Sequence, residues 1–232
     1  MRATAFFFAT DTQTYVITAR HNLLPIDTDT FATGNYPLFE NEIDHFLPEI
    51  DLYLGEGDSR TRHKIDIQDK PEIRLDNRVD VVGIPTDLTP EDYGYTVWSP
   101  SDIIAPDSTG DTIESVGFPG RSFPLGGDEY DTDQYKDSIT NPCLHTIAPE
   151  HASQHPVPDD TGLLEIGFDT DQGMESPEYN GFSGSPVLGN GLVGIHESNT
   201  RVPVKNMKTG ETGELMVINY WRADILTLLL LN

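Results

Sequence analysis

The sequence predicts an all-β protein, a double barrel or sandwich of antiparallel strands with one helix at its C-terminal end. Three observations indicate this class. Short apolar or alternating runs, which are typical of strands, recur along the chain. Its 20 Gly and 17 Pro are scattered between these runs, as frequent turns require. Segments long enough to be the crossover helices of a parallel sheet are few.

The first half of the chain supplies one set of strand-like runs. Residues 3–8 are almost wholly apolar, and residues 14–19 follow after the turn-forming Asp11-Thr12-Gln13. Residues 42–47 could form one helical turn. The expected strands of this half cover residues 3–8, 14–19, 50–54, 64–67 and 79–84.

A second set of strands begins after residues 86–112, a stretch with three prolines that is the best candidate for a linker. Residues 120–138 are polar and indicate a long surface loop, while residues 199–214 suit a hairpin tip. The Leu-rich end of the chain predicts a helix over residues 220–232, which is too short to span a bilayer and is expected to pack on the body. The expected strands of this half cover residues 112–118, 144–148, 163–168, 185–188, 191–196 and 215–218.

The chain is strongly acidic, which excludes some partners. Asp and Glu number 39 against 14 Lys and Arg, a net charge of −25 over 232 residues. Such a surface repels nucleic-acid phosphates and anionic lipid, so we expect neither as a partner. The lack of a long apolar run and of a secretory signal predicts a soluble, cytoplasmic protein. The single cysteine, Cys143, excludes an internal disulfide and any multi-cysteine metal site.

The acidic residues are interspersed with strand patterns, which argues against disorder as their cause. Their excess resembles the bias of proteins from salt-adapted organisms, especially haloarchaea. Self-repulsion at this charge density destabilises a compact state in dilute buffer. At molar salt the Debye length is about 3 Å, so most of the repulsion is screened. We therefore hypothesise a halophilic source.

One turn-forming motif could carry chemistry. Gly181-Phe182-Ser183-Gly184-Ser185-Pro186 directly precedes a strand, and such a turn can aim a hydroxyl outward while the N–H groups of Gly181 and Ser183 face one small pocket, as in an oxyanion hole. The simpler interpretation is a turn without chemistry. The esterase-type nucleophile elbow fits less well, because Ser185 stands where that motif has Gly and a strand follows instead of a helix.

A serine nucleophile needs a base and a carboxylate that orients it. His21 lies at the end of the strand-like run 15–21, where a barrel delivers side chains to a cleft. Asp80 sits in an apolar run, and a carboxylate buried there requires hydrogen bonds. Asp51 competes for the same role, although alternation can place it on a wet face of its strand.

Together these residues resemble the trypsin-like (chymotrypsin-fold) serine peptidases, in the disulfide-free bacterial and archaeal form. Val-Ile-Thr-Ala-Arg-His ending at His21, Asp-Val-Val-Gly-Ile from Asp80 and Gly-Phe-Ser-Gly-Ser-Pro around Ser183 are similar to the three motifs of that family and occur in its order. The spacings of 59 and 103 residues suit one barrel per gap. The resemblance covers roughly residues 4–220 and implies a serine endopeptidase.

The resemblance implies a single peptidase domain over residues 1–232 with two six-stranded-type antiparallel barrels. Residues 1–100 would form the N-terminal barrel, residues 111–219 the C-terminal barrel and residues 220–232 the helix. Its substrate would be a protein or peptide, and it implies no cofactor or metal.

The resemblance also assigns roles. Ser183 would be the nucleophile, His21 the general base and then acid, and Asp80 the carboxylate that orients His21. The N–H groups of Gly181 and Ser183 would form the oxyanion hole, and hydrolysis would run through an acyl-enzyme.

Other functions stay open. Only 20 residues precede His21, room for two strands where the family usually has three, which suits a latent or non-catalytic peptide-binding module on the same fold. A soluble esterase could use the same triad. Glu197 could form an acidic pocket for a basic side chain or be an exposed acid, and the neighbouring His196 is equally ambiguous. The sequence leaves the oligomeric state and the natural substrate undetermined.

Overall fold

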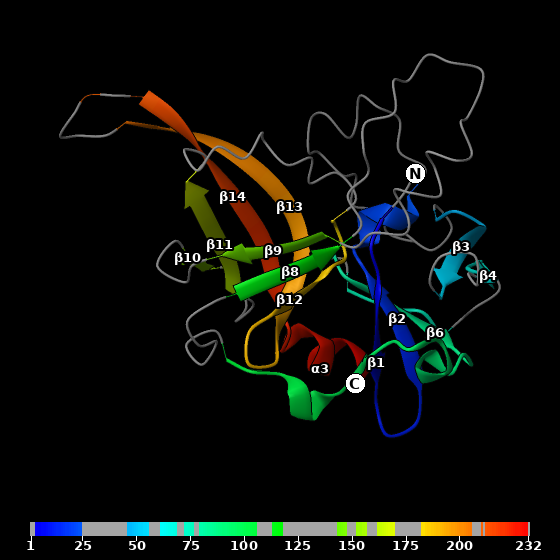
Figure 1. The fold of residues 1–232 in the computed structure, drawn as a ribbon. Coiled ribbons are helices and arrows are strands. Elements are labelled where there is room, and N and C mark those ends of the chain that lie inside the picture. The colour runs from blue at the N-terminus through cyan, green and yellow to red at the C-terminus, as the bar shows by residue number, and fades with distance from the viewer. Residues whose placement is uncertain are drawn as a thin grey trace, which may run out of the picture.

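The structure is a computed structural model of the 232-residue chain. It is mostly β-sheet with one short helix at the C-terminal end (Figure 1). It describes residues 3–24, 46–55, 61–68, 72–76, 79–105, 113–117, 143–147, 152–156, 162–169, 182–205, 210 and 212–231.

A five-stranded sheet forms the centre of the N-terminal half. Its strand order is β5-β6-β2-β1-β7, and every neighbouring pair is antiparallel except β1 and β7. β1 and β2 are a hairpin whose turn is closed by the Thr10 N–H, which donates to the Gln13 carbonyl at 2.9 Å. The strands are β1 (Phe6–Ala9), β2 (Thr14–Thr18), β5 (Arg74–Leu75), β6 (Val82–Thr86) and β7 (Val97–Trp98).

Two further strands, β3 (Glu49–Leu54) and β4 (Thr61–Asp66), pair as a separate antiparallel hairpin. Three short 3₁₀ turns complete the described part of this half, namely η1 (Arg20–Leu23), η4 (Pro90–Tyr93) and η5 (Pro100–Asp102). The stretch expected as a linker therefore holds β7 and two 3₁₀ turns within residues 86–105. Residues 42–45 of the expected helical turn, and residues 120–138, lie outside the described residues.

A seven-stranded antiparallel sheet forms the C-terminal half, in the order β10-β11-β14-β13-β12-β8-β9. The register of β13 against β14 shifts between His196 and Ser198, which makes Glu197 an extra residue in the ladder, a β-bulge. The strands are β8 (Ile113–Gly117), β9 (Cys143–Ile147), β10 (Ala152–Pro156), β11 (Gly162–Asp169), β12 (Pro186–Leu188), β13 (Leu192–Lys205) and β14 (Thr212–Arg222).

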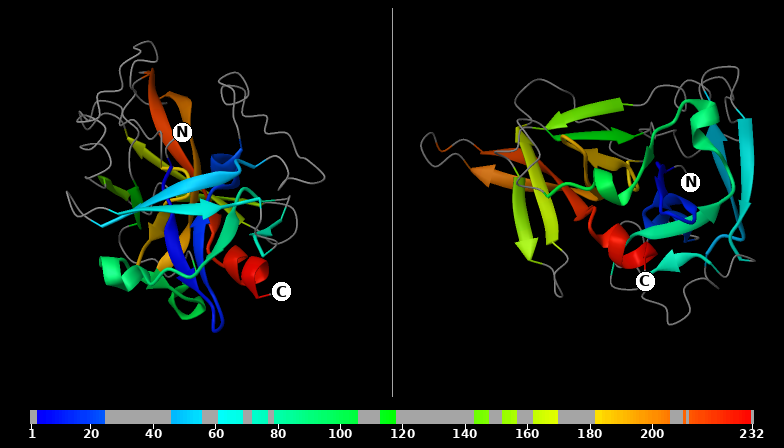
Figure 2. Two further views of the ribbon diagram at one scale, coloured as in Figure 1. Left: turned by 90° about the vertical axis from the view of Figure 1, so that its right-hand side faces the viewer. Right: turned by 90° about the horizontal axis from the view of Figure 1, so that it is seen from below.

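The run Phe6-Phe7-Phe8 is apolar throughout because both faces of β1 are buried. Successive side chains of a strand point to opposite faces. Phe6 and Phe8 pack in one core with residues of β13, β14 and the C-terminal helix, whereas Phe7 packs in a second core with residues of β3 and β4. Figure 2 shows β3 and β4 in cyan on one side of the blue strands and the seven-stranded sheet on the other. The first core therefore joins the two halves.

The C-terminal helix α3 covers Ile225–Leu230, which is shorter than the expected residues 220–232. Tyr220 and Trp221 instead continue β14, where they pair with His196 and Ile195 of β13. Aromatic side chains favour a pleated, half-buried surface, which accounts for a strand instead of a helix at these positions. No helix in the described part of the chain has the length and apolar character that crossing a bilayer requires.

The expectation of a largely antiparallel β protein with a C-terminal helix is confirmed. The described strands do not close either large sheet into a barrel. Their edges are β5 and β7 in one sheet and β10 and β9 in the other.

Candidate active site

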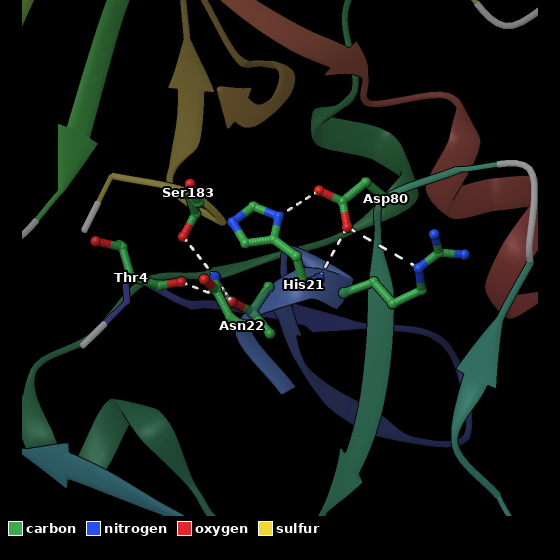
Figure 3. Close-up of polar contacts among 7 residues, drawn as sticks. Thr4, His21, Asn22, Asp80 and Ser183 are labelled. Carbon is green, nitrogen blue, oxygen red and sulfur yellow. Dashed lines mark hydrogen bonds and ion pairs between the residues drawn. The ribbon is translucent and has the colours of Figure 1, made fainter. Parts of the chain in front are cut away.

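His21 and Asp80, which are 59 residues apart in sequence, lie side by side in the structure. His21 belongs to η1, directly after β2, and Asp80 precedes β6, which pairs with β2. The His21 Nδ1 and the Asp80 Oδ2 are 2.5 Å apart (Figure 3). The His21 backbone N–H donates to Asp80 Oδ1 at 2.9 Å, and the Arg20 N–H donates to the Asp80 carbonyl at 3.2 Å. Because β2 and β6 are antiparallel neighbours, the end of β2 and the start of β6 lie side by side, and this places His21 next to Asp80.

Both side chains of this pair are buried, with 3% of His21 and 8% of Asp80 exposed. A buried carboxylate is costly unless donors surround it. Here Asp80 accepts from the backbone and ring of His21, and the Arg20 Nε lies 4.0 Å from its Oδ1. In a neutral His21 that donates from Nδ1, Nε2 is the acceptor nitrogen of the ring. Asp80 is bound on the Nδ1 side of the ring, so Nε2 lies on the side away from this carboxylate.

Asp51, the competing carboxylate, lies away from this pair. It is on β3, where it accepts two hydrogen bonds from the Arg62 guanidinium, each 2.7 Å long. The hydrogen bond and charge of Arg62 hold the pKa of Asp51 below its usual value. Of the two acids that the sequence left open, the structure brings Asp80 against His21 and pairs Asp51 with Arg62.

Ser183 lies on the opposite side of the His21 ring from Asp80, facing the second ring nitrogen (Figure 3). It belongs to the tight turn that precedes β12, and its side chain is half-buried. Gly184 has φ +90°, and a Cβ at this position would collide with the Thr4 carbonyl and the Thr18 hydroxyl. The turn therefore requires Gly after Ser183, both for its backbone angle and for its close approach to the N-terminal half.

Hydrogen bonds fix the peptide units on both sides of Ser183. The Phe182 carbonyl accepts from the Ser185 N–H at 2.8 Å, and the Gly184 N–H donates to the His196 carbonyl at 2.8 Å. In a trans peptide the carbonyl and the N–H point in opposite directions. The Ser183 N–H belongs to the same peptide unit as the bound Phe182 carbonyl. It therefore points in the opposite direction to that carbonyl, and its orientation is fixed. Gly181, the other expected donor, lies outside the described residues.

His196, whose role the sequence left open, is fully buried. Its Nδ1 lies 3.2 Å from the Ser115 Oγ, and its ring packs at 5.8 Å from the ring of Phe182. These contacts make His196 part of the support beneath the turn.

Glu197 is a residue of the site whose place the sequence did not reveal. It is the bulged residue of β13 and is half-buried, so it is not the exposed acid that the acidic composition suggested. Burial and the negative charge of Asp80 raise its pKa to about 7, against the opposing effects of His21, the Trp221 indole and Arg20. A bulge re-aims a side chain, and its register cannot be read from a polar run such as His196-Glu197-Ser198.

Asn22 is a residue near the site that the sequence analysis did not single out. It follows His21 in η1, and its side-chain amide donates to the Ser183 carbonyl at 2.9 Å. Asn is common in turns for several structural reasons, so its presence after His21 does not indicate a particular partner. No local pattern points to a hydrogen-bond partner 161 residues away.

Within the described residues, no three His, Cys, Asp or Glu side chains gather closely enough to hold a metal ion. The arrangement offers instead a base, its orienting carboxylate and a hydroxyl. No model of a known protein family matches this chain. No curated protein matches it either.

Proposed function

We propose that the protein is a serine endopeptidase with His21, Asp80 and Ser183 as its catalytic triad. One observation carries the proposal: residues distant in sequence lie in the order Asp80, His21, Ser183, with the 2.5 Å contact between the His21 Nδ1 and the Asp80 Oδ2 at its centre. A serine hydroxyl is a weak nucleophile until an adjacent base takes its proton. The buried pair is suited to this task because Asp80 fixes the ring and leaves Nε2 on the side of Ser183.

In the proposed reaction the Ser183 Oγ attacks the carbonyl carbon of a peptide bond, and its proton passes to the His21 Nε2. Asp80 stabilises the resulting imidazolium without taking its proton. The N–H groups of Ser183 and Gly181 bind the oxyanion. The leaving amine takes the proton from His21, and a water molecule activated by His21 then hydrolyses the acyl-enzyme and frees Ser183.

The proposal includes the fold that the motifs imply, a barrel over residues 1–100 and another over residues 111–219, with the site between them. Two features support it. The N-terminal half contributes His21 and Asp80 and the C-terminal half contributes Ser183. The first core, which contains Phe8 and Ile195, packs these halves together. A cleft between two β units would leave an extended peptide room to reach all three residues.

A fluorophosphonate probe tests the proposal, because it reacts only with an activated serine. The purified protein would be exposed to it in about molar KCl, beside the variants Ser183→Ala and His21→Ala. Labelling of the wild type alone, together with cleavage of a fluorogenic peptide mixture, is the expected result. Labelling with turnover of a p-nitrophenyl ester but no peptide cleavage would identify an esterase.

Absence of labelling in a wild type shown by circular dichroism to be folded would reject the catalytic proposal. A latent site or a peptide-binding module would then be the better description. Equal labelling of Ser183→Ala would place the reactive group elsewhere in the chain.

A further inference from the structure

Ser183 is tied to the N-terminal half by its backbone carbonyl as well as by its place beside His21. This carbonyl accepts two hydrogen bonds, from the Asn22 side-chain amide at 2.9 Å and from the Thr4 N–H at 3.3 Å. Both donors belong to the N-terminal half, and the acceptor belongs to the turn before β12. The two halves of the candidate site are therefore joined at the nucleophile itself.

The same donors are connected to each other through Thr18, at the end of β2. Its hydroxyl donates to the Thr4 carbonyl at 2.8 Å and accepts from the Asn22 amide at 3.0 Å. The four bonds close into a ring that runs from Asn22 to Ser183, Thr4 and Thr18 and back to Asn22, and we call it the Asn22 network. Figure 3 shows Asn22 beside Ser183 and Thr4. Thr4 and Thr18 are both buried, which keeps water from competing for these bonds.

The network engages every side-chain donor hydrogen of Asn22 and Thr18 and both electron pairs of the Ser183 carbonyl. The two amide hydrogens of Asn22 serve the two acceptors, the single hydroxyl hydrogen of Thr18 serves Thr4, and the two electron pairs of the Ser183 carbonyl are both occupied. Removal of one member leaves another buried polar group without its partner.

The position of the network relates it to function. Asn22 directly follows His21, so the 3₁₀ turn that carries the base also binds the nucleophile. The peptide unit between Ser183 and Gly184 is held at both ends, its carbonyl by the network and its N–H by the His196 carbonyl. A peptide unit held in this way cannot rotate, and the Cα of Ser183 keeps its distance from His21.

We propose that Asn22, acting through its bonds to the Ser183 carbonyl and to Thr18, is a positioning residue that sets the nucleophile relative to the base. The proposal rests on the peptidase function proposed above. Displacement of a reacting group by about 1 Å can cost about a hundredfold in rate. A network that couples two chain segments 161 residues apart is suited to prevent such a displacement.

The test compares Asn22→Leu, which keeps the size of the side chain but removes its hydrogen bonds, with wild type. We expect the rate constant for fluorophosphonate labelling to fall about ten- to a hundredfold. Amide hydrogen exchange, followed by mass spectrometry on peptides that contain Gly184 and Ser185, is expected to become faster because the turn is released. Ile65→Val, in the β4 strand that contributes nothing to the network, is the control for general loss of stability.

A second pair of variants tests the ring without altering Asn22. Thr18→Val removes the hydroxyl at nearly constant shape, and Thr18→Ser keeps it. We expect Thr18→Val to lower the labelling rate and to speed exchange in the same peptides, and Thr18→Ser to restore most of both. This pair decides the matter if Asn22→Leu does not fold.

The outcomes separate the two proposals. If wild type is not labelled, the peptidase proposal fails, and the exchange of the turn amides still shows whether the network holds Ser183. If exchange near Gly184 is the same in Asn22→Leu and Thr18→Val as in Ile65→Val, the positioning role is rejected. A fall in labelling no larger than that of Ile65→Val rejects it as well.

Discussion

At the scale of single residues, the environment of an acidic side chain decides whether it can take part in the candidate site. Asp51 and Asp80 both stand in strand-like runs, and their sequences alone do not distinguish them. Asp51 pairs with Arg62 on a solvated strand, whereas Asp80 is buried and bound by the His21 turn. Only the second environment couples a carboxylate to a potential base.

This contrast supplies a matched pair of variants. Asp80→Asn removes the acceptor that orients His21, and we expect it to lower the fluorophosphonate labelling rate by about a thousand- to ten-thousandfold. Asp51→Asn loses only an exposed ion pair, and such pairs contribute about 0–1 kcal/mol, so its rate is expected to stay within about twofold of wild type. Equal losses in the two variants would contradict the assignment of Asp80.

Glu197 predicts a specific dependence of stability on pH. Its pKa is raised to about 7, against about 4.3 for an unperturbed Glu, so the folded state holds the proton more tightly than the unfolded state does. The resulting stabilisation is complete below about pH 4.3 and is lost as the pH rises through about 7. It amounts to at most about 4 kcal/mol.

The measurement is the melting temperature of wild type and of Glu197→Gln between pH 4 and 8. Other carboxylates titrate in both proteins, so the difference between the two curves is the informative quantity. We expect the wild type to lose stability relative to Glu197→Gln between about pH 4.5 and 7. Parallel curves would mean that Glu197 does not hold a proton in the folded protein.

At the scale of elements, apolar patterning predicts the strands whose side chains are buried. The run at residues 3–8 and the alternating run at 50–54 correspond to β1 and β3, because burial of one or both faces leaves a pattern in the sequence. β5 and β7 have two residues each and leave no such pattern. β13 extends to Lys205 through polar residues, where ladder hydrogen bonds do not depend on apolar side chains.

The candidate site divides in the same way. His21 at a strand end and Ser183 in a Gly-rich turn belong to local patterns and can be singled out as candidates from sequence. The selection of Asp80, the bulge at Glu197 and the bond from Asn22 to Ser183 depend on contacts between distant segments. Local sequence does not encode those distances.

Helix α3 gives a stability prediction for one element. Leu226 is fully buried and belongs to the first core, whereas Leu228 of the same helix is 57% exposed. Leu226→Ala should lower the free energy of unfolding by about 2–5 kcal/mol, because it leaves a cavity in the core. Leu228→Ala should change it by about 0.5 kcal/mol or less.

Urea unfolding of both variants in about molar KCl measures the difference. Both substitutions replace Leu with Ala in the same helix and so change helix propensity by a similar amount, which isolates the effect of burial. A similar loss in both would mean that α3 does not dock on the first core, and with it the packing of the two halves would be in question.

At the scale of the whole molecule, two effects of charge oppose each other. A net charge of −25 repels itself and destabilises the compact state, and salt relieves this. Salt also weakens attractive pairs, such as Lys64 with Glu49 at 2.6 Å and Arg62 with Asp51 at 2.7 Å. Both pairs are largely exposed, and each contributes about 0–1 kcal/mol, so there is little attraction for salt to remove.

Because repulsion exceeds attraction, added salt should stabilise the folded protein. We expect the melting temperature to rise steadily as KCl increases from about 10 mM, where the Debye length is about 30 Å, to about 1 M, where it is about 3 Å. Sucrose at the same osmolality, which stabilises by exclusion from the surface without screening charge, should reproduce only a small part of the rise. A melting temperature in dilute buffer equal to that in molar KCl would refute adaptation to salt, and an equal rise in sucrose would assign the effect to solvent exclusion instead of charge.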